Sequence, residues 1–141
     1  VNALQDSTRK ALTVVVDGTG RLAAMADALG RVMLVDLATL PPMLIRMWKG
    51  YREAQMAFFQ SPLTPESGAG AVEKSRRQYQ LFLAIYAPRR GLLEVWEMRN
   101  GNRQAILNVG KNCRLVNVTS PMGKRLSTHT PSRCFLVVGE G

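Results

Sequence analysis

"LAAMADALGRVMLVDLATLPPMLIRMWKG", residues 22–50, is followed sixty positions later by a similar stretch, "FLAIYAPRRGLLEVWEMRNGNRQAILNVG", residues 82–110. The two stretches align without a gap, so that Val35 falls on Val95 and the short apolar runs coincide. In both stretches Gly, Pro or Asn separates the apolar runs, and these are the residues that tight turns require. Similarity at a fixed period indicates that one supersecondary unit occurs twice in the chain.

Short apolar runs of five or six residues continue on both sides of this repeat. They occupy residues 12–16, 22–26, 31–36, 43–48, 54–59, 81–86, 92–96, 104–109, 113–118 and 134–138. Strands of this length, spaced about ten residues apart by turn residues, are typical of an all-β protein. Several runs are apolar at consecutive positions, which predicts sheets that are buried on both faces.

The length of the repeat indicates a particular all-β architecture. The stretch "SPLTPESGAGAVEKSRR" (61–77) is rich in Pro, Gly, Ser and charge, so we expect an inserted surface loop over 60–78. Without that stretch the period is 43 residues, which matches the roughly 40–45 residues of a four-stranded propeller blade. We therefore predict a partial WD40-like β-propeller over 1–141, with about two to three blades of antiparallel strands. Its predicted parts are a blade over 11–59, the inserted loop 60–78, a blade over 79–118 and a further strand over 133–138.

The beginning of the same stretch also allows a dinucleotide-binding fold. In "VVVDGTGRLAAMADALGRVMLVD" a predicted strand leads into Gly18 and Gly20, and a second strand ends at Asp36. Glycines in such a turn can admit a pyrophosphate, and the acid can bind a ribose. This alternative, a fragment of a dinucleotide-binding oxidoreductase, requires a helix over 21–29. The propeller prediction requires a strand there and a turn at Asp36.

The charge of the chain leaves a further alternative open. Its 141 residues carry a net charge of +9, with 46% hydrophobic residues and 21% charged residues, which is typical of a globular domain. A basic surplus attracts nucleic acids, anionic membranes and acidic proteins. A basic nucleic-acid-binding domain is therefore an alternative function. The positive charges are spread along the chain and form no single stripe, which favours a protein without a nucleic-acid partner.

Few residues are available for catalysis or for metal binding. The single histidine, His129, lies in the loop-like sequence "STHTPS" and has no neighbour of ligand type. We predict no catalytic residue, no metal site and no cofactor. Cys113 and Cys134 lie far apart without CxxC spacing, which predicts two reduced thiols in a cytoplasmic protein. No segment looks like a signal peptide or a membrane span.

Three stretches resemble one known family. "DGTGRLAAMADALGRVMLVD", "IRMWKGYREAQ" and "YAPRRGLLEVWEMRNGNRQAILNVGKNCRLV" are similar, in this order, to the N-terminal domain of the non-catalytic (regulatory) subunit of the Rab-three GTPase-activating protein. The resemblance covers roughly residues 12 to 118, and blocks 45–55 and 86–116 are its most specific parts. The sequences of two other segments, 61–77 and 119–133, depart from the family's pattern.

The resemblance implies a binding role without catalysis. The family's N-terminal region looks like a WD-type propeller, and its subunit pairs with a separate catalytic subunit in a heterodimer. This chain is therefore expected to act as a regulatory and scaffold subunit that helps regulate a Rab small GTPase in vesicle and endoplasmic reticulum traffic. The expected location is the cytoplasm, with peripheral association at endoplasmic reticulum or vesicle membranes.

The segment "RMWKGYREAQ", 46–55, combines aromatic and basic side chains. Such clusters form hot spots of protein interfaces, and they also stack on single-stranded nucleic acid. The plainer interpretation is a connection between blades in which the aromatic rings pack inward and the charges face out. The candidate partner-binding residues here are Arg46, Trp48, Lys49, Tyr51 and Arg52.

The motif "APRRG" (87–91) supplies two further candidates, Arg89 and Arg90, at a predicted hairpin turn. Exposed guanidinium groups can make paired hydrogen bonds with carboxylates or phosphates. The plainer interpretation is a charged turn that only faces water. Lys111, in "NVGKNCRL" (108–115), occupies the corresponding connection of the next unit and is the last candidate. Trp96 is expected to pack in the core.

Overall fold

A computed structural model describes residues 11–62, 79–118 and 132–139. Within these ranges the chain forms ten β-strands and no helix. The strands are β1 (Ala11–Val16), β2 (Leu22–Asp27), β3 (Val32–Asp36), β4 (Met43–Trp48), β5 (Gln55–Pro62), β6 (Tyr79–Ala87), β7 (Leu92–Glu97), β8 (Arg103–Asn108), β9 (Cys113–Val118) and β10 (Arg133–Val138).

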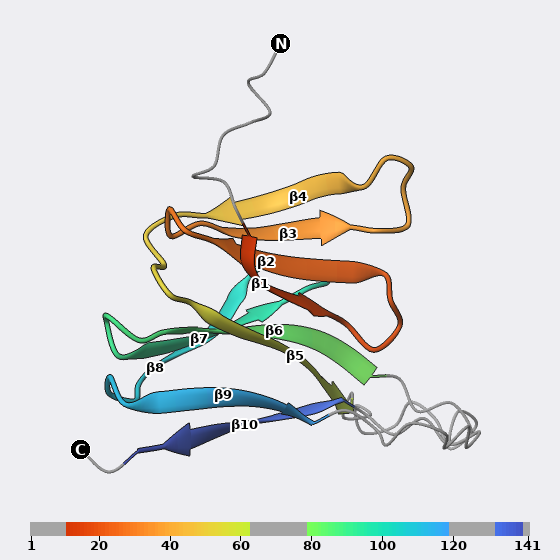
Figure 1. Ribbon diagram of the computed structural model, residues 1–141. Helices are drawn as coiled ribbons and strands as arrows, with labels where there is room; N and C mark the ends of the chain where they lie inside the picture. The colour runs from red at the N-terminus through yellow and green to blue at the C-terminus, as the bar shows by residue number, and fades with distance from the viewer. Residues whose placement is uncertain (1–10, 63–78, 119–131, 140–141) are drawn as a thin grey trace, which may run out of the picture.

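The strands form three antiparallel sheets in sequence order. The first sheet has the order β1-β2-β3-β4, the second β5-β6-β7-β8, and the third pairs β9 with β10. The three sheets are stacked one on the next, with the second sheet in the middle (Figure 1). The first strands of the sheets lie together, because β5 contacts both β1 and β9. Each sheet therefore begins at the same side of the stack and proceeds outward.

The described residues confirm an all-β chain and show that the dinucleotide-binding alternative is wrong. Leu22–Asp27 forms β2, paired on both sides with β1 and β3, where that alternative requires a helix. Buried residues occur at both even and odd positions of β2, with Ala24 and Ala26 in the core between the sheets and Ala23 on the opposite face. Asp36 ends β3 and holds the turn that follows, because its carboxylate accepts a hydrogen bond from the Ala38 amide at 2.8 Å.

The sheets group the strands differently from the predicted blade ranges. β5 lies within the range 11–59 that was predicted as one blade, yet it pairs along its whole length with β6 of the second sheet. β5 also continues to Pro62, whose partner is Tyr79, so the connection predicted over 60–78 begins later. The cause is long-range pairing: two strands that flank a long connection satisfy each other's backbone groups, and this is invisible in the local pattern.

The main core fills the space between the first two sheets. Its buried residues come from both facing surfaces and from the connection after β4; they are Ala24, Ala26, Val32, Leu34, Trp48, Tyr51, Ala54, Met56, Phe58, Leu83, Ile85, Ala87 and Trp96. The rings of Trp48 and Trp96 meet at its outer part, 5.4 Å apart and tilted by 60°. Trp96 is 9% exposed, as predicted for a core residue.

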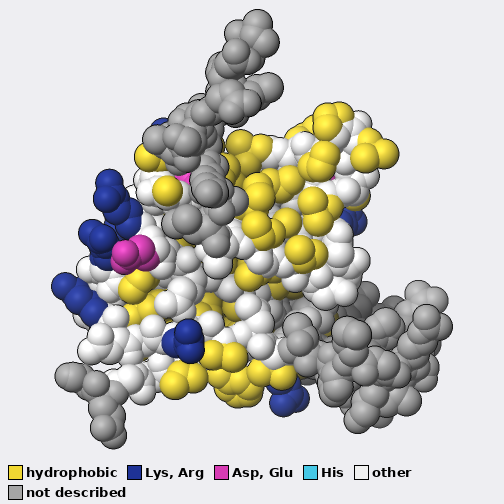
Figure 2. Space-filling view, in the orientation of Figure 1, with side chains coloured by type: hydrophobic (Ala, Val, Ile, Leu, Met, Phe, Trp, Pro, Cys, Tyr) yellow, Lys and Arg dark blue, Asp and Glu magenta, His cyan; other side chains and the backbone are white. Residues whose placement is uncertain are grey.

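The opposite face of the first sheet is apolar but open. The register places Val14 beside Met25 and Val35 beside Leu44 on this face. Val14 and Leu44 are about half exposed, at 53% and 49%, whereas Val35 is only 9% exposed, so the face is open mainly along its two outer strands. Figure 2 shows the hydrophobic side chains gathered over the region of β1–β4. A face of this composition is suited to packing against a further apolar layer.

Leu83→Ala tests whether the two sheets share one core. Leu83 lies in β6 and is fully buried in the contact between the sheets, so its truncation leaves a cavity. We expect the free energy of unfolding to fall by about 2–5 kcal/mol, measured by urea denaturation followed by circular dichroism. Leu40→Ala is the matched control, because Leu40 is 96% exposed and its truncation should change stability by less than about 0.5 kcal/mol. Equal effects of the two changes would contradict the shared core.

Candidate functional site

Three connections that follow β4, β6 and β8 lie at one end of the stacked sheets (Figure 1). They comprise residues 49–54, 88–91 and 109–112. The last two touch directly, because the amide of Gly110 donates to the carbonyl of Gly91 at 3.1 Å. The first lies against the β2–β3 turn, where the Tyr51 amide donates to the Gly30 carbonyl at 2.8 Å. The first also meets the second, because the guanidinium carbon of Arg90 lies 5.3 Å from the centre of the Tyr51 ring, so the three connections form one continuous surface.

Five of the eight predicted site residues are exposed on these three connections. We call this set the basic loop surface; it consists of Lys49, Arg52, Arg89, Arg90 and Lys111. Figure 2 shows Lys and Arg side chains gathered along this edge of the molecule, at the left of the view, around an acidic side chain. The structure thus brings together residues that are up to 62 positions apart in the sequence.

Arg89 points toward the one carboxylate among the described residues of these connections. Its Nε and Nη2 atoms lie 3.3 and 3.4 Å from the two carboxylate oxygens of Glu53. The hydrogen bond with Arg89 lowers the pKa of Glu53 and raises the pKa of Arg89. Both side chains are about 60% exposed, so water and salt screen the pair. The contact orients Arg89 without removing it from solvent.

Arg90 is held over the neighbouring connection. Its guanidinium carbon lies 5.3 Å from the centre of the Tyr51 ring, a cation–π distance. Gly50, at φ 86°, makes room for this approach, because a Cβ atom there would lie 2.8 Å from Arg90 Nη2. The positive φ requires glycine for the turn, and the missing side chain also leaves room for the tip of Arg90.

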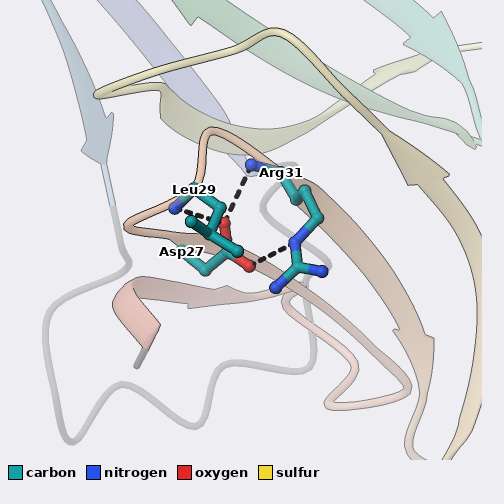
Figure 3. A network of polar contacts seen from close by, with 3 residues as sticks. All are labelled: Asp27, Leu29 and Arg31. Carbon is teal, nitrogen blue, oxygen red and sulfur yellow. Dashed lines mark hydrogen bonds and ion pairs between the residues drawn. The ribbon is translucent and has the colours of Figure 1, made fainter. Parts of the chain in front are cut away.

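The corresponding turn of the first sheet contrasts with the Arg89–Arg90 turn. In the β2–β3 turn the carboxylate of Asp27 accepts hydrogen bonds from the amides of Leu29 and Arg31, at 3.0 and 2.9 Å. It also pairs with Arg31 Nε at 2.6 Å (Figure 3). At the equivalent position of the β6–β7 turn stands Ala87, which offers no carboxylate. The arginine of the first turn is therefore neutralised within the turn, while those of the second reach outward.

The same network determines the ionisation of Asp27. Burial acts to raise the pKa of this carboxylate, but the hydrogen bonds from Arg31 and Leu29 and the charge of Arg31 together outweigh burial and lower the pKa. Asp27 therefore stays ionised at neutral pH although it is only 1% exposed. Asp27 and Arg31 thus form an ion pair that holds the β2–β3 turn together.

Two other predicted site residues, Arg46 and Trp48, lie in the contact between the sheets. The guanidinium carbon of Arg46 lies 5.0 Å from the Trp48 ring centre and 4.4 Å from that of Trp96. Arg46 Nη1 also donates to the Gly101 carbonyl of the second sheet at 2.5 Å. The arrangement links β4 to the second sheet.

Tyr51 also reaches across from the connection into the second sheet. Its hydroxyl donates to Glu94 Oε1 at 2.5 Å, and Arg103 Nη1 donates to Glu94 Oε2 at 3.1 Å. Glu94 is 3% exposed, so its carboxylate depends on these two donors for hydrogen bonds, and Arg103 supplies the opposite charge. Arg90, Tyr51 and Glu94 therefore form a continuous series of contacts from the basic loop surface into the core.

The sequence interpretation missed the two glutamates that organise this end. Glu53 lies within the aromatic-basic segment 46–55, and an acid among three cations was an available signal. Glu94 interrupts the apolar run "LLEVW", and a lone acid in such a run indicates a buried, paired carboxylate. Its partner Tyr51 lies 43 positions away, and nothing local connects the two.

Other predictions concern reactive groups. Cys113 and Cys134 are free thiols, and burial raises the pKa of Cys134. In the part of the chain that the structure describes, no three His, Cys, Asp or Glu side chains are grouped to hold a metal ion. Over the same described residues there is no helix long and apolar enough to cross a membrane. His129 lies outside the described residues.

Comparison with known proteins identifies the family. Residues 1–116 match the family described as Rab3 GTPase-activating protein regulatory subunit N-terminus. The chain belongs to this family. The resemblance seen in the sequence is thereby confirmed, and its most specific blocks contain all eight predicted site residues.

A relative from Caenorhabditis elegans supports the same assignment. The chain is 31% identical over 137 residues to the Rab3 GTPase-activating protein regulatory subunit of that organism, covering 95% of this chain. It spans 9% of the length of the relative. No solved structure matches the chain significantly.

Tyr51→Phe tests the contact with Glu94. Loss of the hydroxyl leaves Glu94 Oε1 buried without its donor, so we expect the free energy of unfolding at pH 7 to fall by about 1–3 kcal/mol. Urea denaturation measures the change. Tyr79→Phe, in half-buried Tyr79 at the start of β6, is the control and should cost less than about 0.5 kcal/mol.

The same variant should alter the alkaline pH dependence. Burial, and then the hydrogen bond with Glu94, raises the pKa of Tyr51 from 10.0 to about 12. A raised pKa in the folded state contributes stability that is complete below pH 10 and is lost as pH rises toward 12. The difference in stability between the native protein and Tyr51→Phe should therefore shrink across that interval. A constant difference would contradict the assigned contact.

Asp27→Ala tests the ion pair in the β2–β3 turn. The change removes three hydrogen bonds and leaves Arg31 without its partner, so we expect a loss of about 2–4 kcal/mol at pH 7. Because the pKa of Asp27 is lowered in the folded state, its contribution is present above about pH 4 and disappears as pH falls further. Denaturation at pH 7 and pH 3 should show a larger effect at pH 7. The reverse order would refute the pair.

Proposed function

We propose that this chain forms part of the non-catalytic regulatory subunit of a Rab GTPase-activating complex. The observation that carries the proposal is the family match over residues 1–116, together with the 31% identity to the nematode regulatory subunit. In this function the chain binds and positions partners, and a separate catalytic subunit accelerates GTP hydrolysis.

The sheets are proposed to be blades of a WD40-like β-propeller. Two four-stranded antiparallel sheets and a third, two-stranded one follow each other in sequence order. Their first strands lie together, as strands near the axis of a propeller do. The apolar outer face of β1–β4, with Val14 at 53% exposure, has the composition that contact with another blade requires.

The proposed partners follow from the function. The chain, as part of the longer subunit, would pair with the catalytic subunit in a heterodimer and help present a Rab small GTPase to it. The complex would act in the cytoplasm on vesicle and endoplasmic reticulum traffic, with peripheral association at those membranes. The net charge of +9 favours association with the anionic surfaces of vesicle and endoplasmic reticulum membranes.

Reconstitution with the full-length subunit tests this function. The subunit is co-expressed with its candidate catalytic partner, and GTP hydrolysis by a Rab protein is measured with each component alone and with both. We expect the two subunits to purify together and hydrolysis to be faster with both than with the catalytic subunit alone. The regulatory subunit by itself should leave the intrinsic rate unchanged.

Two results would count against the proposal. Separate elution of the two subunits, with no effect on Rab hydrolysis, would remove the regulatory role. Acceleration of hydrolysis by the regulatory subunit alone would show that it is itself catalytic.

A further inference from the structure

We propose that the basic loop surface is a docking site for an acidic segment of a protein partner, whose carboxylates displace Glu53 from Arg89 and pair with Arg90. The proposal assigns a partner chemistry to one surface. It holds whichever protein carries the acidic segment, so it does not depend on the regulatory role proposed above.

The first support is the local excess of positive charge. The connections 49–54, 88–91 and 109–112 contain five Lys or Arg residues and one acidic residue, Glu53. All five cations are exposed at one end of the stack. Charges of one sign gathered on one surface attract and orient an oppositely charged partner.

The second support is that the β6–β7 turn lacks the acidic residue that neutralises the arginine of the β2–β3 turn. Asp27 and Arg31 of the β2–β3 turn satisfy each other at 2.6 Å. In the β6–β7 turn the aligned residues are Ala87 and Gly91, and two arginines stand between them. The β2–β3 turn forms without outward-facing arginines. The β6–β7 turn therefore does not need Arg89 and Arg90 for its own stability.

The third support is that Arg90 is already positioned. The Tyr51 ring lies beneath its guanidinium, and Gly50 leaves the space that this approach needs. Tyr51 is itself held by Glu94 at 2.5 Å. A side chain that is ordered before binding loses less conformational entropy when a partner arrives.

Glu53 indicates that the preferred ligand is a carboxylate. Arg89 presents Nε and Nη2 to its two oxygens, the paired geometry in which guanidinium groups bind carboxylates. The distances of 3.3 and 3.4 Å are long for such bonds, and both partners are exposed. The pair is therefore easily replaced by a better-placed carboxylate.

Titration of the full-length subunit with a peptide of ten glutamates tests the site. Binding is measured by calorimetry at low salt for the native protein and for two double variants. In Arg89→Gln/Arg90→Gln the affinity should fall about tenfold. Arg21→Gln/Arg99→Gln removes the same charge from exposed turns at the other end of the sheets, and it should change the affinity less than about twofold.

A third variant tests the displacement. Glu53→Gln frees Arg89 from its internal partner and should tighten peptide binding by about twofold or more. A purely structural role of Glu53 would leave the affinity unchanged or weaken it. Circular dichroism of each variant shows whether the fold is kept, so that a folding defect is not read as loss of binding.

Several outcomes would overturn the proposal. These are no peptide binding, equal losses in the two double variants, or no gain in Glu53→Gln. Tighter, Arg89/Arg90-dependent binding to vesicles of phosphatidylcholine and phosphatidylglycerol, or to a twenty-nucleotide single-stranded DNA, would assign the site to phosphates instead. Co-purification with the catalytic subunit is measured in parallel, so that failure of this inference is distinguishable from failure of the proposed function.

Discussion

Burial of the facing surfaces of the first two sheets determines where the aromatic and basic side chains that follow β4 lie. Trp48 ends β4 inside this contact, and the chain must leave it through a tight connection that begins the second sheet. Because Tyr51 is packed inward to reach Glu94, its neighbours Lys49 and Arg52 remain at the surface. The positions of Lys49 and Arg52 in the basic loop surface are thus a consequence of how the core is closed, and they depend on the two sheets staying together.

The strands were predictable because their signals are local. Apolar runs between turn residues located all ten strands to within a few positions, and the repeat indicated two similar sheets. Which strands share a sheet was harder to predict from the sequence. β5 and β6 are separated by residues 63–78 in the chain, and their pairing is decided by backbone hydrogen bonds across that gap. A local pattern places a strand, but its partner is determined by the whole sheet.

In the candidate site, too, local features were predictable from the sequence and long-range contacts were not. The arginines of "APRRG" were expected at an exposed turn, and they are exposed there. The segment "RMWKGYREAQ" divides into two groups by the direction of its side chains. Arg46, Trp48 and Tyr51 face the second sheet, while Lys49 and Arg52 face water. Composition alone could not separate these groups, because a cluster of aromatic and basic residues has the same composition whether its side chains lie at an interface or in a core.

The placement of the two tryptophans gives the molecule a built-in optical reporter. The chain contains two tryptophans, and both meet between the first two sheets, with the guanidinium of Arg46 near both rings. Their emission therefore reports on this single contact. Separation of the sheets would expose both indoles to water at once and shift the fluorescence to longer wavelength, whereas events at the third sheet would leave the spectrum unchanged.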